Sequence, residues 1–164
     1  MSEITYDLES FKKEINFFCD IEYTSELEAR MNKLLYTVKT WVLSYCNRVQ
    51  RTDKETGELI FDEFINELKP IALQEAVRRF LLDLINKGQF KPHGGGSEEE
   101  ESTGEIQSVK IGDTTVTSGT GTKRSSKEIT ESFQKQLTDE LKEIKLELNN
   151  YRHMFRYGDI YESI

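Results

Sequence analysis

The chain has 164 residues and a formal net charge of −8, with 36% hydrophobic and 32% charged residues. This length allows one domain with a moderate core, or a smaller bundle with appendages. Residues 1–90 carry 16 acids and 12 bases, and residues 91–164 carry 14 and 10. No stretch is basic enough to neutralise a row of phosphates, which argues against direct nucleic-acid binding. No apolar run approaches the roughly 18 residues that a membrane span needs.

The cysteines and the N-terminal residues indicate a compartment. Cys19 and Cys46 lie among apolar residues on helical patterns and lack the CxxC spacing. They are therefore expected to be two buried free thiols in a reducing cytosol. The first residues are acidic and contain no hydrophobic signal core, so we do not expect export. We expect the protein to be assembled in a cytoplasm.

The first 87 residues are predicted to form a helical bundle core. Apolar residues at helical spacing predict a short helix over residues 8–20. Ser25, with Glu28 three residues later, predicts an N-cap with a capping box. The helix that follows carries the strongest amphipathic pattern in the chain, running roughly seven turns, and ends in a turn-rich link at residues 52–57. Its apolar stripe consists of Leu27, Met31, Leu34, Leu35, Val38, Trp41, Val42, Tyr45 and Val49.

Pro70 interrupts a third helical stretch, which is expected to begin near Asp62. Proline cannot continue a hydrogen-bonded helix interior but fits the first turn of a new helix. The pattern therefore predicts a kink or break at Pro70, a helix over residues 71–87 and a C-terminal stop at Gly88.

A β-hairpin is predicted over residues 106–119, between two flexible segments. Gly112 and Asp113 suit the central positions of a type II′ turn, which sets Ile111 opposite Thr114 and Val109 opposite Val116. A lone two-stranded hairpin needs a surface to pack against. We therefore expect an inter-subunit hairpin that docks onto a partner or a second copy. The alternative is that it folds back onto the helices of its own chain.

The last part of the chain is predicted to contain one long helix. Ser125 or Ser126 is expected to cap a helix from Lys127 to about Phe155, with an apolar seam suited to pairing with one other helix. The seam consists of Ile129, Phe133, Leu137, Leu141, Ile144, Leu148 and Tyr151. The residues predicted to anchor a partner are Tyr151, Arg152, Tyr157, Ile160, Tyr161 and Ile164.

The expected fold is mainly α, a helical bundle with a protruding β-hairpin on flexible tethers and a long C-terminal helix. The expected division is a helical core at 1–87, an acidic glycine-rich linker at 88–105, the hairpin at 106–119, a linker at 120–126, a long helix at 127–156 that completes the bundle and an apolar anchoring tail at 157–164.

No pattern in the chain predicts an enzyme, a metal site or a cofactor. The stretch His93–Gly96 resembles an oxyanion loop, but the chain has no G-x-S-x-G nucleophile elbow. Residues 53–57 lack the glycine and glutamate positions of a calcium loop. Two histidines and two buried cysteines give no plausible metal-ligand set. Glu140 and Glu143 are expected to belong to a solvated, charged helix face.

The order of the parts resembles the head–tail connector (adaptor) proteins of tailed bacteriophages. The resemblance is carried by the proline-started helix over residues 70–84, the I-G-D turn at residues 111–113 and the aromatic–arginine pair Tyr151-Arg152. It covers roughly residues 25–156. It implies a virion component of the neck, a ring of typically twelve copies that lies between the portal protein and a tail-side neck protein. DNA would pass through the ring without sequence-specific binding.

The same features leave alternatives open. In one alternative, the chain is a subunit of the collar of a phage-tail-like particle that has no head. A different class of function is a helical interaction or scaffolding protein that pairs through its C-terminal helix. A third is an enzyme whose site is assembled from unrecognised carboxylates, which would show a pH-dependent activity.

Overall fold

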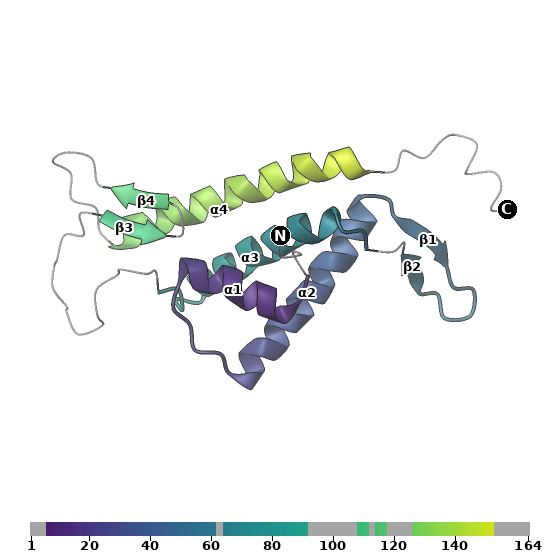
Figure 1. Ribbon diagram of the computed structural model, residues 1–164, viewed down its shortest axis with the longest axis horizontal. Coiled ribbons are helices and arrows are strands. Elements are labelled where there is room, and N and C mark those ends of the chain that lie inside the picture. The colour runs from purple at the N-terminus through teal and green to yellow at the C-terminus, as the bar shows by residue number, and fades with distance from the viewer. Residues whose placement is uncertain (1–5, 62–63, 92–107, 112–113, 118–125, 153–164) are drawn as a thin grey trace.

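Helix α3 (Leu68–Asn86) lies at the centre of the computed structural model, and the other helices of the described residues pack on it (Figure 1). They are α1 (Leu8–Phe18), α2 (Ser25–Tyr45) and α4 (Ser126–Leu148), the last followed by a 3-10 turn at Asn149–Tyr151. The structure describes residues 6–61, 64–91, 108–111, 114–117 and 126–152. The expectation of a mainly helical chain is confirmed.

The central position of α3 follows from its sequence, which is apolar around most of the helix circumference. Its buried side chains are Leu68, Ile71, Ala72, Leu73, Glu75, Ala76, Val77, Phe80, Leu81 and Leu84. The prediction of a break at Pro70 and a helix starting at residue 71 is wrong in position, because α3 begins at Leu68 and Pro70 lies within its first turn, where a proline needs no N–H partner. The prediction of a helical stretch that begins near Asp62 is wrong for residues 64–67, which are not helical. In a continuous helix the ring of Pro70 would meet the carbonyl of Asn66, four residues earlier.

Side-chain caps define the starts of the first two helices. Asp7 accepts a hydrogen bond from the backbone N–H of Ser10 at 2.7 Å, and Thr24 accepts one from Leu27 at 3.2 Å. The predicted cap at Ser25 is therefore one residue too late. Thr24 has the extended backbone of an N-cap and Ser25 is already helical, so the hydroxyl of Thr24 reaches the free N–H groups.

Helices α2 and α3 end in the same way, with a residue in the left-handed conformation. Asn47 follows α2 with φ 55°, and Gly88 follows α3 with φ 67°. At each end, the N–H of the left-handed residue and the N–H of the residue after it donate to carbonyls of the last helical turn, as in a Schellman motif. The stop at Gly88 is confirmed. The stop at Asn47 shortens α2, so Val49 belongs to a strand and not to the helical stripe.

The link between α2 and α3 contains an unpredicted hairpin. Strands β1 (Val49–Thr52) and β2 (Leu59–Phe61) pair antiparallel with an irregularity between Val49 and Arg51. Asp53 closes the turn, because its Oδ1 accepts from the N–H groups of Glu55 at 2.8 Å and Thr56 at 3.0 Å. These backbone hydrogen bonds also lower the pKa of the Asp53 carboxyl. The expectation of a simple turn-rich link is corrected to this hairpin.

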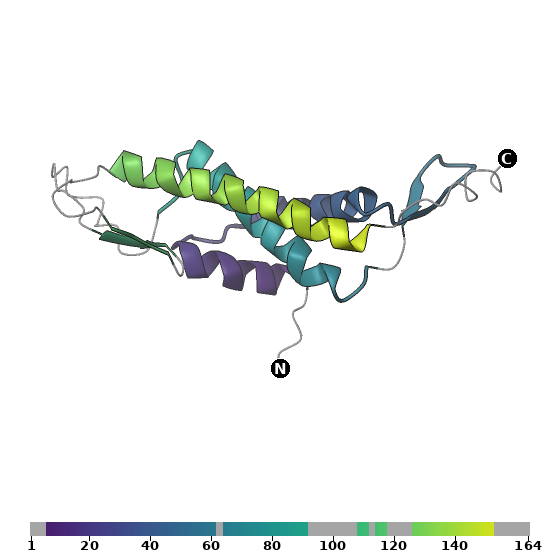
Figure 2. The same ribbon diagram turned by 90° about the horizontal axis from the view of Figure 1, so that it is seen from above.

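A second pair of strands, β3 (Ser108–Ile111) and β4 (Thr114–Thr117), is antiparallel with Val109 opposite Val116 and Ile111 opposite Thr114. The turn residues Gly112 and Asp113 and the two flanking segments lie outside the described residues. Figures 1 and 2 show the pairs β1–β2 and β3–β4 at opposite ends of an elongated helical body.

The seam predicted for the last helix is used within the chain, because α4 packs along α3. Ile129, Phe133, Leu137, Ile144 and Leu148 are all buried. Helix α4 ends earlier than expected, at Leu148, and residues 149–151 tighten into the 3-10 turn. Two consecutive asparagines, which are poor helix formers, explain this end. Residues beyond 152 lie outside the described residues.

Aromatic side chains fill the spaces between the helices. Phe11 of α1 meets Phe80 of α3 edge-on, with 5.5 Å between ring centroids. Phe133 of α4 stacks on Phe90 at 5.3 Å. Cys19 and Cys46 are buried free thiols, as expected, and burial raises the pKa of Cys19 to about 12. None of the described helices is both long and apolar enough to cross a membrane.

Candidate functional site

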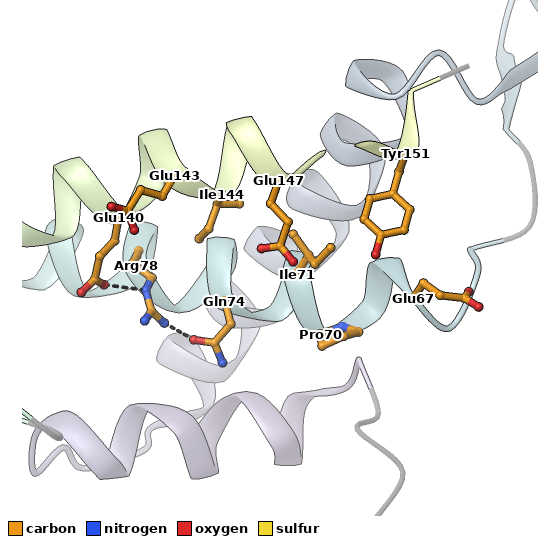
Figure 3. A pocket seen from close by; sticks show the side chains of 10 residues that line it. All are labelled: Glu67, Pro70, Ile71, Gln74, Arg78, Glu140, Glu143, Ile144, Glu147 and Tyr151. Carbon is orange, nitrogen blue, oxygen red and sulfur yellow. Dashed lines mark hydrogen bonds and ion pairs between the residues drawn. The ribbon is translucent and has the colours of Figure 1, made fainter. Parts of the chain in front are cut away.

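An open groove of about 630 Å³ runs between α3 and α4 (Figure 3). Its lining comes from the start of α3, from the last turns of α4 and from the 3-10 turn that follows. The lining residues are Glu67, Pro70, Ile71, Gln74, Arg78, Glu140, Glu143, Ile144, Glu147 and Tyr151. Apart from the adjacent pairs Pro70–Ile71 and Glu143–Ile144, the α3 and α4 residues are three or four positions apart, which places them on one face of each helix.

The floor of the groove is apolar. Ile71 and Ile144 are 7% and 8% exposed and belong to the common core. Pro70 lies beside them at the start of α3, and Tyr151 lies at the same end of the groove (Figure 3). The floor is therefore the edge of the helix–helix contact, where the core reaches the surface.

A chain of polar contacts fixes one end of the groove. Arg78 donates from Nε to Glu140 Oε2 at 2.9 Å and also donates from Nη1 to Gln74 Oε1. Gln74 in turn donates to Glu14 of α1 at 3.3 Å. The network links α1, α3 and α4. Glu140 is therefore an ion-pair partner with 28% side-chain exposure, and the expectation that it belongs to a solvated face is corrected.

The walls of the groove are acidic. Glu67, Glu143 and Glu147 are exposed, and the structure gives none of them an ion pair with another described residue. With Glu140 opposed by Arg78, the lining has four carboxylates and one guanidinium, a net charge of −3. An apolar floor between acidic walls suits a partner surface that combines an apolar anchor with a positive charge.

A cluster of cations and aromatic rings lies where α2, α3 and α4 meet. Trp41 stacks on Tyr45 with 5.3 Å between centroids. The guanidinium of Arg79 lies 4.5 Å from the centroid of Trp41, and Lys145 Nζ lies 5.9 Å from it. Arg79 also pairs with buried Glu75 at 2.8 Å. Burial raises the pKa of the Glu75 carboxyl, and the neighbouring Arg79 opposes that rise.

The segment that follows α2 holds the end of α4 in place. The thiol of Cys46 donates to the carbonyl of Leu148 at 3.6 Å. Arg48 donates from Nη2 to the carbonyl of Tyr151 at 3.3 Å. Tyr45 completes these contacts, with its hydroxyl donating to Asn149 Oδ1 at 2.9 Å.

Two of the residues predicted to anchor a partner lie beside these contacts. Tyr151 is half-buried and lines the groove. Arg152 is exposed, with its guanidinium 5.2 Å from the ring of Tyr45. The other predicted anchors, Tyr157, Ile160, Tyr161 and Ile164, lie outside the described residues, as do Gly112 and Asp113 of the hairpin.

The structure contains features that sequence reasoning missed. The groove depends on the packing of two helices 40 or more residues apart, which no local pattern encodes. The contacts Trp41–Tyr45 and Glu75–Arg79 could have been predicted from their spacing in the sequence, because residues four apart on a helix are neighbours. Among the described residues, no group of three or more histidine, cysteine, aspartate or glutamate side chains is placed to hold a metal ion.

Comparison of the chain with models of protein families, with curated proteins and with solved structures gave no match.

Proposed function

We propose that this chain is a structural head–tail connector subunit, which forms a ring with copies of itself and joins the portal of a tailed bacteriophage to its tail. The observation that carries the proposal is the placement of two β-hairpins at opposite ends of an elongated helical body (Figures 1 and 2). A subunit of this shape has contact points for a different neighbour at each end. A connector needs that arrangement, because it meets the portal on one side and a neck protein on the other.

The burial of the α4 seam supports this function over a helix-pairing interaction protein. Pairing through α4 requires its apolar stripe to be free for a partner. Phe133 and Leu137 are 1% and 0% exposed within the single chain, and α3 already covers that stripe. Leu146 is the large hydrophobic side chain of α4 that remains exposed, at 67%, and one such residue makes no seam.

The charge of the chain is compatible with a DNA conduit. A net charge of −8 repels the phosphate backbone, so DNA would move through an acidic ring without binding to it. The ring of typically twelve copies and the two neighbours are the components that the sequence resemblance implies. The collar of a headless phage-tail-like particle would use the same contacts.

The test is to image the purified full-length protein by negative-stain microscopy and to measure its mass by light scattering over a wide range of concentrations. Closed rings with a central opening are the expected result. A chain that ends at Phe155 serves as a companion sample. It is expected to stay folded, and to lose affinity if the tail anchors a neighbour. A protein that stays monomeric at every concentration and forms no ring contradicts the proposal.

A further inference from the structure

We infer that the groove between α3 and α4 receives the exposed face of α2 from a second copy of the same chain. This face, the α2 face, consists of the exposed residues Lys33, Tyr36 and Thr37 and the half-buried Thr40. The inference rests on the proposed function, because it names the contact through which neighbouring subunits of the ring would join.

Tyr36 is the natural anchor of the α2 face. Its side chain is 73% exposed, the highest value among the exposed large hydrophobic residues of the described part of the chain. The hydroxyls of Thr37 and Thr40 already donate to the carbonyls of Lys33 and Tyr36, at 2.8 and 3.0 Å. These hydroxyl donors would therefore need no new partner if the face were buried.

The charge of α2 is opposite to that of the groove. Residues 29–52 contain five bases and no acid. Arg30 is paired with Asp83, whereas Lys33 is exposed on the α2 face. In the groove, Glu143 and Glu147 are exposed and have no ion pair with another described residue. An ammonium group beside a protruding tyrosine thus complements two carboxylates beside an apolar floor.

The groove is large enough for such an anchor. Its volume of about 630 Å³ falls within the range of about 300–1,000 Å³ that is usual for binding pockets. Ile71 and Ile144 offer an apolar surface for the tyrosine ring, and the acidic side chains at the rim can meet the lysine. Aromatic anchors in such positions commonly carry much of the binding energy of an interface.

The two surfaces lie on different sides of the subunit. In Figure 3 the groove faces the viewer and α2 lies behind α3. Contact between two different surfaces is heterologous, and repeated contacts of this kind close into a ring when the rotation allows it. A symmetric dimer through the groove would instead bring acidic walls together. The distribution of charge therefore favours the head-to-tail contact.

Two double variants of the full-length protein test the contact. The first, Lys33→Glu with Tyr36→Ala, damages the α2 face and leaves the groove intact. The second, Glu143→Lys with Glu147→Lys, damages the groove and leaves the α2 face intact. Two exposed residues elsewhere give matched controls, Phe17→Ala for the loss of an aromatic ring and Lys135→Glu for the reversal of a charge. Circular dichroism checks that every variant keeps the helical content of the wild type.

Each double variant is expected to abolish rings when measured alone by mass photometry and negative-stain microscopy, whereas both controls keep them. A mixture of the two variants should form dimers and no larger species, because only one intact pair of surfaces remains in each dimer. A chain that combines Lys33→Glu with Glu147→Lys exchanges the charges across the contact. It should recover rings that the single Lys33→Glu variant loses.

The outcomes separate this contact from the proposed function. If the wild type forms rings and both double variants form them equally well, the ring is real and the proposed contact is wrong. If the wild type forms no ring at any concentration, the connector proposal fails, and the contact fails with it. Rings lost in the groove variant but kept in the α2-face variant would show that the groove binds another occupant, which also overturns the inference.

Discussion

Arg79 donates from Nε to Oε1 of Glu75 at 2.8 Å, in a pair whose carboxylate side chain is 2% exposed. The other carboxylate oxygen, Glu75 Oε2, is buried without a hydrogen-bond partner among the described residues. Removing one member of a buried ion pair leaves an uncompensated charge and typically costs about 3–5 kcal/mol, whereas replacing the pair by apolar residues is often neutral. The two residues therefore make unequal contributions to stability.

Arg79→Ala is expected to destabilise the protein by about 3 kcal/mol, the lower end of that range, because Arg79 itself is partly exposed. It also removes the contact with the ring of Trp41. Adding Glu75→Leu to Arg79→Ala should recover part of the loss. Urea unfolding followed by circular dichroism measures both variants. Equal stability of the single and double variants would show that Glu75 is not an uncompensated charge once Arg79 is gone.

The raised pKa of Glu75 predicts a pH dependence of stability with a definite sign. Burial makes the folded state bind a proton more tightly than the unfolded state does. The contribution of this group to stability is therefore complete below its usual value near 4.5, and is lost as the pH rises through the higher folded-state value. Glu75→Gln cannot ionise, so its melting temperature relative to the wild type should rise across this window. A difference that stays constant from pH 4 to pH 8 would contradict the prediction.

Two leucines of α4 offer a matched comparison of buried and exposed positions. Leu137 is 0% exposed and Leu146 is 67% exposed. Leu137→Ala should cost about 2–5 kcal/mol through lost burial and a cavity, and Leu146→Ala should change stability by less than about 0.5 kcal/mol. Chemical denaturation of both variants measures the difference. Similar small effects would mean that α4 does not belong to the core.

Gly88 tests the backbone conformation at the end of α3. Its φ of 67° lies in the left-handed region, and an added Cβ would meet no atom within 4 Å. Gly88→Ala should therefore cost about 1–2 kcal/mol for conformational reasons alone. The melting temperature of this variant is compared with that of a control variant, Lys87→Ala, at the neighbouring exposed position. A loss no larger than that of the control would show that the stop does not depend on glycine.

The β3–β4 hairpin is predicted to be an inter-subunit contact. Val109, Ile111 and Val116, which the sequence pattern sets on one face, are changed together to serine. The helical signal should stay as in the wild type, and assembly into rings should fail. The matched control changes Lys110, Thr115 and Thr117 of the opposite face to serine. A triple variant that loses its helical fold would instead indicate that the hairpin packs on its own helices.

The sequence pattern is sufficient to predict the helices, because their apolar residues recur with a helical period over several turns. It was less informative at their ends. Thr24 and Ser25 are both good caps, so composition alone does not choose between them. Asn47 takes a left-handed conformation usually associated with glycine, and no glycine or proline before Val49 marks the end of α2 in the sequence.

Strands and tertiary features were harder to predict. The strand β1, with Gln50 and Arg51 between Val49 and Thr52, is short and lacks a regular alternation of apolar residues. The groove arises only when α4 meets α3, so its apolar floor and acidic walls come from segments far apart in the sequence. Arg78 and Glu140 illustrate this, since each looks like an ordinary surface charge until the helices pack.

The central position of α3 has a consequence for synthesis on the ribosome. Residues 87–125 separate the end of α3 from the start of α4. At about 5–20 residues per second, this stretch takes roughly 2–8 s to be made. During that time Ile71 and the rest of the α4-facing side of α3 have no cover from α4, although α1 and α2 are already available. Nascent chains that stall in this interval expose an apolar surface and are expected to be especially prone to aggregation.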